Sequence, residues 1–282
     1  MSKYLTAGQI EAFGDDVKHA YQAEGSTLRK TARAKNGVVG GTYQFPTLSK
    51  GTATPRVPQT DVIPMNVVHA RVTATLTDWN APEYTDVFDQ PKNNVDEQKE
   101  LSFTIGSALG RRDDQVMLDA LDAASTSQTV AHGSANLTTA KFRSGKRFLD
   151  KIGAGKTDRY AVIHANNLYG MLGDSDADTF DKNAVKALVD GEINKWLGFE
   201  VITLEDRDEG GLPVASSIRT TYFYHGGPRG TLGLAVGIDM RTEVNYIAEK
   251  TSWLANGLYS AGAVGIEATG IVEIFCDESG VV

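Results

Sequence analysis

A helical repeat of apolar residues opens the chain. Within residues 6–24 four large side chains fall on one face of a helix, and acidic residues occupy the other sides. That apolar face consists of Ile10, Phe13, Val17 and Tyr21. A polar, basic and glycine-bearing stretch follows at 25–37, which predicts an extended linker. Because the helix has little of its own chain to pack against, we expect it to bind a partner surface.

The next pattern is that of two strands with a long connection. The segments "TYQFPTL" and "VVHARVTATLTDW" both indicate strands, and the second alternates apolar and polar positions from Val68 to Leu76, as in a half-buried strand. The loop at 49–64 has no apolar periodicity, and it carries Pro55, Pro58 and Pro64 together with Lys50, Arg56 and Asp61. Such a loop cannot stabilise itself by packing. We therefore expect a protruding hairpin whose loop is mobile in the free chain and ordered by a neighbour.

The longest helical pattern covers residues 94–124. Its apolar face is interrupted around Arg111–Gln115. Three acids, Asp96, Glu97 and Glu100, lie in the early turns, where the helix dipole favours negative charge. The pattern predicts one long helix with an imperfect apolar stripe.

A second helix is predicted in "TTAKFRSGKRFLDKI", and the "GAGKT" after it resembles the end of a phosphate-binding loop. That loop requires G-x-x-x-x-G-K-[ST] between a strand and a helix. Counting back from Gly155, the first position is Asp150, and a helix precedes the glycines instead of a strand. We therefore expect the glycines to end the helix, not to bind a nucleotide.

From Tyr160 onward short strands and helices alternate, beginning with the buried strand "YAVI", which indicates an α/β subdomain. The final stretch, with "MRTEVNYIAE" and "GIEATGIVEIFC", predicts long strands that return to the body. The fold class expected from these elements is α+β.

Composition excludes several classes of protein. A net charge of −8 argues against a protein whose main function is to bind nucleic-acid phosphates. A mean hydropathy of −0.26 agrees with finding no apolar run long enough to cross a bilayer, and the start shows no secretory signal. The single cysteine, Cys276, lies in an apolar run, which predicts a buried structural thiol and no disulfide within the chain.

Candidate sites for chemistry have simpler explanations. Asp174, Asp176 and Asp178 resemble the start of a calcium-binding loop, but Thr179 and Val185 replace its glycine and its bidentate glutamate. A solvated acidic loop is the preferred interpretation. The histidines show no metal-ligand spacing, and no G-x-S-x-G motif anchors a triad. We expect no catalytic residue, no metal site and no cofactor.

The order of these parts resembles the major capsid proteins of tailed double-stranded DNA phages, which have the Hong-Kong-97-type fold. "LGRRDDQVMLDAL" resembles the long spine helix of that family. "YAVIHANNLYGML" and "DGEINKWLGFEVITLE" resemble its A-domain, and "GTLGLAVG" with "GIEATGIVEIFCDE" resembles its closing part. The resemblance covers nearly the whole chain.

The resemblance implies a division into five parts. These are an N-terminal arm (1–41), a hairpin called the E-loop (42–80), a P-domain with the spine helix (81–157), an α/β A-domain (158–239) and a return to the P-domain (240–282). Some members crosslink a lysine to an asparagine of a neighbour. Lys50 is the conceivable counterpart here, but no partner or supporting acid can be assigned, so this activity is not carried over.

The resemblance also implies a function. Copies of the chain would assemble in the host cytoplasm into hexamers and pentamers of an icosahedral head that encloses the phage genome. The implied partners are a separate scaffolding protein, a portal protein and, as a further candidate, a decoration protein, with packaged DNA bound only non-specifically and no membrane. Lys50 and Arg56 would meet the acids Asp96, Glu97 or Glu100 of the next spine helix, and the arm would bind a neighbour.

Two other functions stay open at this point. One is an α/β ligand-binding or hydrolytic domain in residues 160–239, where Asn166, Asn167 and Tyr169 follow a strand. The other is a calcium-dependent module in residues 174–181. An isolated amphipathic arm and a mobile hairpin are costly features for a monomeric enzyme, and they favour the capsid.

Overall fold

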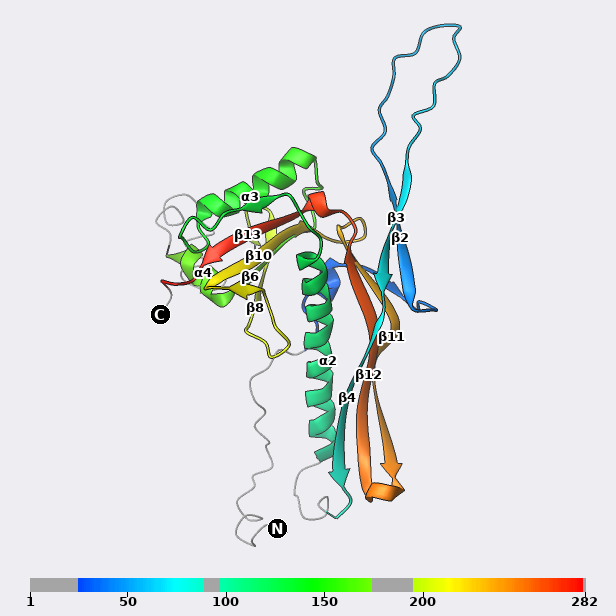
Figure 1. The fold of residues 1–282 in the computed structure, drawn as a ribbon, viewed down its shortest axis with the longest axis vertical. Coiled ribbons are helices and arrows are strands. Elements are labelled where there is room, and N and C mark those ends of the chain that lie inside the picture. The colour runs from blue at the N-terminus through cyan, green and yellow to red at the C-terminus, as the bar shows by residue number, and fades with distance from the viewer. Residues whose placement is uncertain (1–24, 89–96, 174–194, 281–282) are drawn as a thin grey trace.

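The computed structural model describes residues 25–88, 97–173 and 195–280. These residues form a long, narrow part and a compact part, and a hairpin projects beyond them along the long axis (Figure 1). The predicted arm helix at 6–24 and the acidic loop that begins at Asp174 lie outside the described residues.

The long part is a four-stranded sheet with one helix beside it. Its order is β1 (Arg33–Asn36), β11 (Leu232–Ile247), β12 (Ser252–Gly265) and β4 (Thr77–Asp86), and the 3-10 helix η3 (Ala248–Lys250) joins β11 to β12. Helix α2 (Glu97–Asp122) runs along this sheet (Figure 1). The approach is close at Gly257, where a Cβ would lie 2.4 Å from Cγ2 of Ile105. The long helix predicted from the sequence is confirmed.

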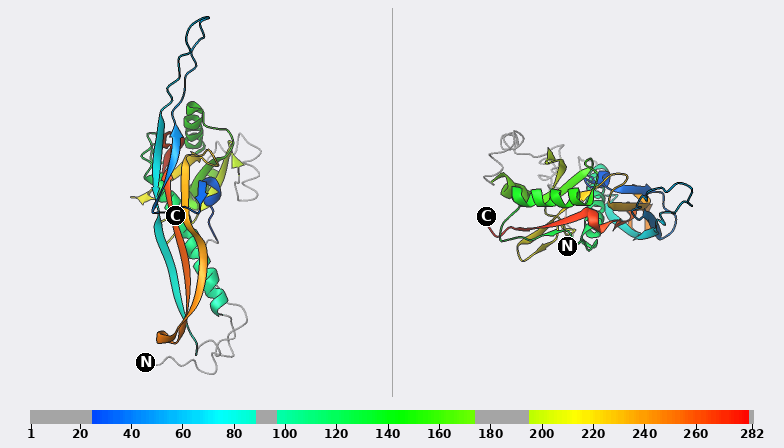
Figure 2. Two further views of the ribbon diagram at one scale, coloured as in Figure 1. Left: turned by 90° about the vertical axis from the view of Figure 1, so that its right-hand side faces the viewer. Right: turned by 90° about the horizontal axis from the view of Figure 1, so that it is seen from above.

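The projecting hairpin consists of β2 (Thr42–Leu48) and β3 (His69–Thr75), which pair antiparallel with Phe45 opposite Val72. It continues the long axis of the sheet (Figures 1 and 2). Only its base is packed, because Phe45 and Ala74 are buried against Ala235 of β11. The predicted hairpin is thus confirmed, although the alternation in β3 buries one residue, Ala74, and leaves Val68 exposed.

A glycine fixes the crossing between the hairpin and the sheet. At Gly262 of β12 a Cβ would lie 1.9 Å from the carbonyl oxygen of Thr75, the last residue of β3. No side chain fits there, because the neighbour is backbone that cannot rotate away. The hairpin therefore leaves the sheet from a point of direct contact between two main chains.

The compact part is built on a second sheet. Its order is β5 (Thr129–Val130), β13 (Ile271–Asp277), β10 (Ile218–His225), β6 (Arg159–His164), β8 (Phe199–Leu204) and β7 (Lys195–Trp196), with β9 (Val214–Ala215) also pairing with β10. The remaining elements are α3 (Thr139–Ile152), α4 (Ala165–Leu172), and the 3-10 helices η1 (Arg29–Thr31) and η4 (Ala268–Gly270). Of the α/β pattern predicted after Tyr160, the described residues confirm β6, α4 and β8, with β6 and β8 parallel, whereas β10 pairs antiparallel with both β6 and β13.

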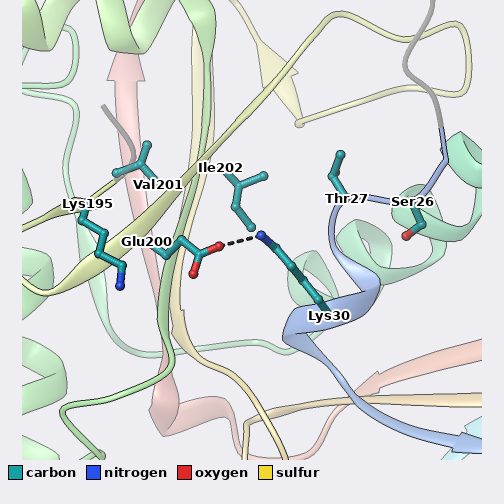
Figure 3. Close-up of a pocket in the computed structure, with 7 residues that line it drawn as sticks. All are labelled: Ser26, Thr27, Lys30, Lys195, Glu200, Val201 and Ile202. Atoms are coloured by element: carbon teal, nitrogen blue, oxygen red, sulfur yellow. Dashed lines mark hydrogen bonds and ion pairs between the residues drawn. The ribbon is translucent and has the colours of Figure 1, made fainter. Parts of the chain in front are cut away.

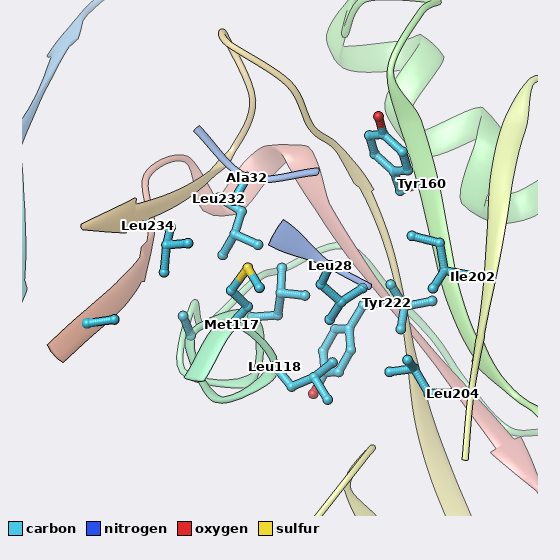
Figure 4. Packing of buried hydrophobic residues seen from close by; sticks show 14 of the residues in the cluster. Leu28, Ala32, Met117, Leu118, Tyr160, Ile202, Leu204, Tyr222, Leu232 and Leu234 are labelled. Carbon is cyan, nitrogen blue, oxygen red and sulfur yellow. The ribbon is translucent and has the colours of Figure 1, made fainter. Parts of the chain in front are cut away.

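Alternate residues of this sheet enter two different cores. Tyr222 and Tyr224 of β10 point toward α2 and the segment that contains Leu28, whereas Phe223 points toward α3. Figure 4 shows Leu28 beside Tyr222 and the α2 residue Met117. Because side chains alternate along a strand, a sheet covered on both faces needs continuous apolar runs. This explains why "YAVI" lacks a polar alternation.

Helix α3 ends where the glycines predicted it. Gly153 takes a left-handed conformation with φ 75°, and its N–H donates to the carbonyls of Leu149 and Asp150. The buried Arg159 closes the turn by donating to the carbonyl oxygens of Ala154 and Gly155. The "GAGKT" segment is a helix end held by an arginine, which confirms the interpretation against a phosphate loop.

The elements do not follow the predicted domain ranges one by one. β11 starts at Leu232, inside the range 158–239, and runs through the long sheet. β13 lies in the compact sheet, although it belongs to the range 240–282. The five-part division stays a prediction. Each of its last two ranges, 158–239 and 240–282, contributes strands to both the long part and the compact part.

Candidate assembly surfaces

The polar interruption of α2 forms a junction between the two parts of the molecule. Asp114 is fully buried and accepts hydrogen bonds from Ser26 Oγ at 2.7 Å, from Thr27 through both N and Oγ1, and from the Leu28 N–H at 2.9 Å. Arg207, whose side chain is also fully buried, donates to the same carboxylate at 3.1 Å. One side chain therefore fastens both the segment 26–28 and the loop after β8 to α2.

The neighbouring acid ties α2 to the long sheet. Asp113 is fully buried and accepts a hydrogen bond from the hydroxyl of Tyr259 on β12. Burial raises the pKa of the Asp113 carboxyl above its usual range. Arg29 lies near this carboxyl and pairs with Asp239 of β11 at 2.8 Å. The two adjacent acids thus bind different layers of the molecule.

The other members of this motif also have defined partners. Arg111 pairs with Glu209 at 3.2 Å, and the guanidinium of Arg112 stacks 4.5 Å from the ring centre of Trp79. Gln115 accepts a hydrogen bond from the Gly211 N–H at 2.9 Å. The sequence indicated only an irregular helix here. The available signal was a block of charged residues inside an otherwise apolar helix stripe.

This junction fixes where the N-terminal segment leaves the body. A Cβ on Gly110 would lie 2.5 Å from the carbonyl carbon of Gly25, so the chain crosses α2 in direct backbone contact. Beside the crossing lies an open hollow of about 490 Å³ between residues 26–30 and β8. Lys30 and Glu200 form an ion pair of 2.5 Å across it (Figure 3). The position of Gly25 at the surface of α2 is consequently fixed by its contact with Gly110.

The loop of the hairpin, residues 49–68, is exposed almost throughout. Lys50 and Arg56 lie on it as predicted, and both are exposed. Its apolar side chains were not foreseen as a group, because they lack a regular spacing. Val62 is 90 % exposed, Ile63 72 % and Met65 61 %. A hairpin that carries such side chains far from its own core presents an uncovered apolar surface.

The other predicted contact residues are only partly described. The arm residues Ile10, Phe13, Val17 and Tyr21, the acid Asp96 and the side chain of Glu97 lie outside the described residues. Glu100 is half-buried near the start of α2. α2 starts at the end of the molecule opposite to the hairpin (Figure 1). Lys50 and Arg56 can therefore reach the start of a spine helix only in another copy of the chain.

Residues considered for chemistry have structural partners. Cys276 is fully buried, and burial raises the pKa of its thiol to about 11, as suits the predicted structural thiol. Asn167 is fully buried, and its side chain donates to Asn136 and Glu278. Its Oδ1 also accepts from the His164 N–H as part of a box that caps α4. The polar residues after β6 thus hold the helix and the C-terminal segment in place.

Within the described part of the chain, no group of three or more His, Cys, Asp or Glu side chains is arranged to hold a metal ion. No helix among these residues is both long enough and apolar enough to span a membrane.

The long sheet with one helix, the compact two-faced sheet and the projecting hairpin are arranged as in solved structures of phage capsids. The capsid of cyanophage P-SCSP1u matches with a TM-score of 0.73 at 16 % identity over 98 % of this chain and 96 % of that one. The head of Helicobacter pylori bacteriophage KHP40 matches with a TM-score of 0.75 at 10 % identity over 95 % of each chain. The acid-stable capsid of Helicobacter pylori bacteriophage KHP30 matches with a TM-score of 0.75 at 9 % identity over 99 % of each chain.

The family comparison assigns the chain. The profile described as phage capsid protein matches residues 5–278, and the chain therefore belongs to this family. A comparison with curated protein sequences gives no significant match. The Hong-Kong-97-like fold and the major capsid function expected from the sequence are both confirmed, and the protein forms the head shell of a phage.

Proposed function

We propose that the chain builds an icosahedral shell from hexamers and pentamers, in which each copy binds its neighbours through the hairpin, the arm and the long sheet. One observation carries this proposal. The hairpin holds exposed Val62, Ile63 and Met65 far from the core of its own chain. Apolar surface of this kind gains about 25 cal/mol per Å² when another copy covers it. Contacts of this head-to-tail type close into rings when the rotation between copies allows it.

The partners follow from this role. We infer a separate scaffolding protein, a portal protein, a decoration protein as a further candidate, and assembly in the host cytoplasm. Packaged DNA would be bound non-specifically, which suits a net charge of −8. The role is structural and not catalytic. The polar residues that a ligand-binding domain would use, such as His164 and Asn167, cap a helix instead.

Electron microscopy of the expressed protein in negative stain tests the proposal. We expect closed shells, rings or sheets. A protein that stays a monodisperse monomer under all assembly conditions, including coexpression with its scaffolding protein, would contradict the proposal.

The hairpin loop gives a second prediction. Trypsin is expected to cut rapidly after Lys50 and Arg56 in free subunits and slowly in shells, because both residues are exposed in the single chain and a neighbour covers them on assembly. Mass spectrometry of the fragments measures this. Cleavage of a reference peptide added to both digests controls for protease activity. Equal protection of the loop in both states would show that it is not an assembly contact.

The arm gives a third prediction. Deletion of residues 1–24 is expected to leave a folded subunit that assembles poorly, because Asp114 already fixes the chain from Ser26 onward. Each large apolar side chain of the predicted arm helix contributes about 1.5–3 kcal/mol when fully buried on a neighbour. Thermal melting and shell yield are the two measurements. A large loss of melting temperature with normal assembly would place the arm in the core of its own subunit.

A further inference from the structure

Helix α3 has an outer face of strongly basic character in a chain of negative net charge. The helix contains five basic residues, and Asp150 is its one acid. Lys141 is buried and donates to the carbonyl oxygens of Ala135 and Phe275, so it does not contribute to the outer surface. Arg143, Arg147 and Lys151 are exposed and Lys146 is half-buried. Residues with these spacings lie on one side of a helix.

Three cations of this face, Lys146, Arg147 and Lys151, have no acidic partner among the described residues. Asp150 pairs at 2.7 Å with Arg159, whose buried guanidinium belongs to the sheet below the helix. Throughout the part of the chain that the structure describes, no ion pair joins Lys146, Arg147 or Lys151 to another residue. Arg147 lies over the ring of Phe148 at 5.3 Å, which supports its stem without changing its charge. The face is therefore a positively charged surface that can bind an acidic partner.

The same subunit carries acids at the opposite edge of its compact part. The loop between β8 and β9, residues 205–213, contains the exposed acids Glu205, Asp206 and Asp208. Its one cation, Arg207, has a buried side chain that pairs with Asp114 and, at 2.8 Å, with Glu205, while Asp206 keeps 75 % of its side chain exposed although it pairs with Arg219. Among the described residues Asp208 forms no ion pair. The outer surface of this loop is thus negative.

Figure 1 shows how these two surfaces are placed. α3 lies along the upper edge of the compact part, on the side toward which the hairpin points, and the loop between β8 and β9 lies at the lower edge beside α2. The view is down the shortest axis of the molecule. If the shortest axis of the subunit spans the thickness of the shell, neighbouring copies contact the edges that form the outline in this view. One of the two flat faces then lines the interior of the shell.

We propose that the basic face of α3 docks on the acidic loop at 205–209 of the next copy in a ring. The proposal rests on the proposed function, since it names a contact within the hexamers and pentamers. A basic edge and an acidic edge on opposite sides of one subunit make a head-to-tail contact in which every copy uses both. Such complementary charges mainly accelerate association and fix register. Nucleic acid is the competing occupant, but the edge position of α3 and the acids supplied by the chain itself favour a second copy.

Charge reversal tests the contact. Three variants of the full chain are compared: Arg147→Glu/Lys151→Glu, Asp208→Lys, and the combination of all three changes. Assembly is followed by light scattering at low and at high salt, with the scaffolding protein present if the wild type requires it. The two single-surface variants are expected to assemble about tenfold more slowly than the wild type at low salt, and the combined variant to recover most of the loss. The wild-type rate is expected to fall as salt rises, because salt screens exposed charges.

Controls separate the possible outcomes. Thermal melting shows that each variant is folded, and Lys195→Glu on β7, at the edge of the compact sheet away from α3, provides a reversal of an exposed lysine. A wild type that forms no assembly contradicts the proposed function, whereas a wild type that assembles with unaffected variants overturns only the α3 contact. A combined variant no faster than either parent also overturns it. If the α3 variant assembles normally but loses binding of random duplex DNA, the face belongs to nucleic acid and the proposal is wrong.

Discussion

Asp114→Ala is expected to lower the free energy of unfolding by about 3–5 kcal/mol, because it removes one member of a fully buried ion pair and leaves the other uncompensated. The carboxylate accepts five hydrogen bonds, from Ser26, Thr27, Leu28 and Arg207. Its loss also releases the segment before η1 from α2. Trypsin is therefore expected to cut faster after Arg29 and Lys30 in the variant.

Urea unfolding followed by fluorescence measures the stability change. Glu243→Ala is the matched control, since it removes an acid from an ion pair with Arg241 in which both side chains are about half exposed. Exposed pairs contribute about 0–1 kcal/mol, so the control should unfold close to the wild type. If Asp114→Ala unfolds within 1 kcal/mol of this control, the junction does not hold the two parts together as we describe.

Phe142→Ala is expected to cost about 3–5 kcal/mol, the range for removing a fully buried aromatic ring. Phe142 is fully buried and packs α3 on the compact sheet together with Leu149. Its ring meets Phe223 at 4.6 Å and Phe199 at 5.4 Å between ring centres, both edge to face. Loss of the ring leaves a cavity between the helix and the sheet, so hydrogen exchange should rise in α3, β6 and β10.

Phe142→Leu keeps most of the volume and serves as the control, with an expected cost of less than about 1.5 kcal/mol. Exchange in β4 and β12 reports on the long sheet, which shares no packing with Phe142. Equal rises in exchange in both sheets would mean that the long and compact parts unfold as one unit. A cost for the alanine variant no greater than for the leucine variant would contradict the packing described for α3.

Elements with a local signature were predicted well. The end of α3 was visible because Gly153 and Gly155 interrupt a helical repeat, and the buried strand β6 was visible as an unbroken apolar run. The hairpin was visible because two strand patterns flank a proline-rich loop. In each case a few adjacent residues determine the local geometry, so the sequence pattern contains the relevant information.

The junction could not be predicted in the same way. Asp114 bonds residues 86–88 positions away in the sequence and Arg207 93 positions away, and only the fold brings them together. From the sequence, Arg111–Gln115 was a defect in an amphipathic stripe. Buried charges in a helix indicate long-range partners, but their identity follows from the topology of both sheets. The basic residues of α3 and the acidic residues of the loop after β8 are likewise unrelated in the sequence. Only the fold places them at opposite edges of the compact part.

The contact between Gly262 and Thr75 couples the orientation of the hairpin to that of the long sheet. Because main chain touches main chain there, the two strands of the hairpin turn with β12 instead of bending independently at their base. A small change in the twist of β11 and β12 therefore sweeps the distal apolar side chains through a wide arc. In the proposed shell, the orientation at which one copy offers Val62 and Ile63 to the next is therefore set by the long sheet inside the subunit.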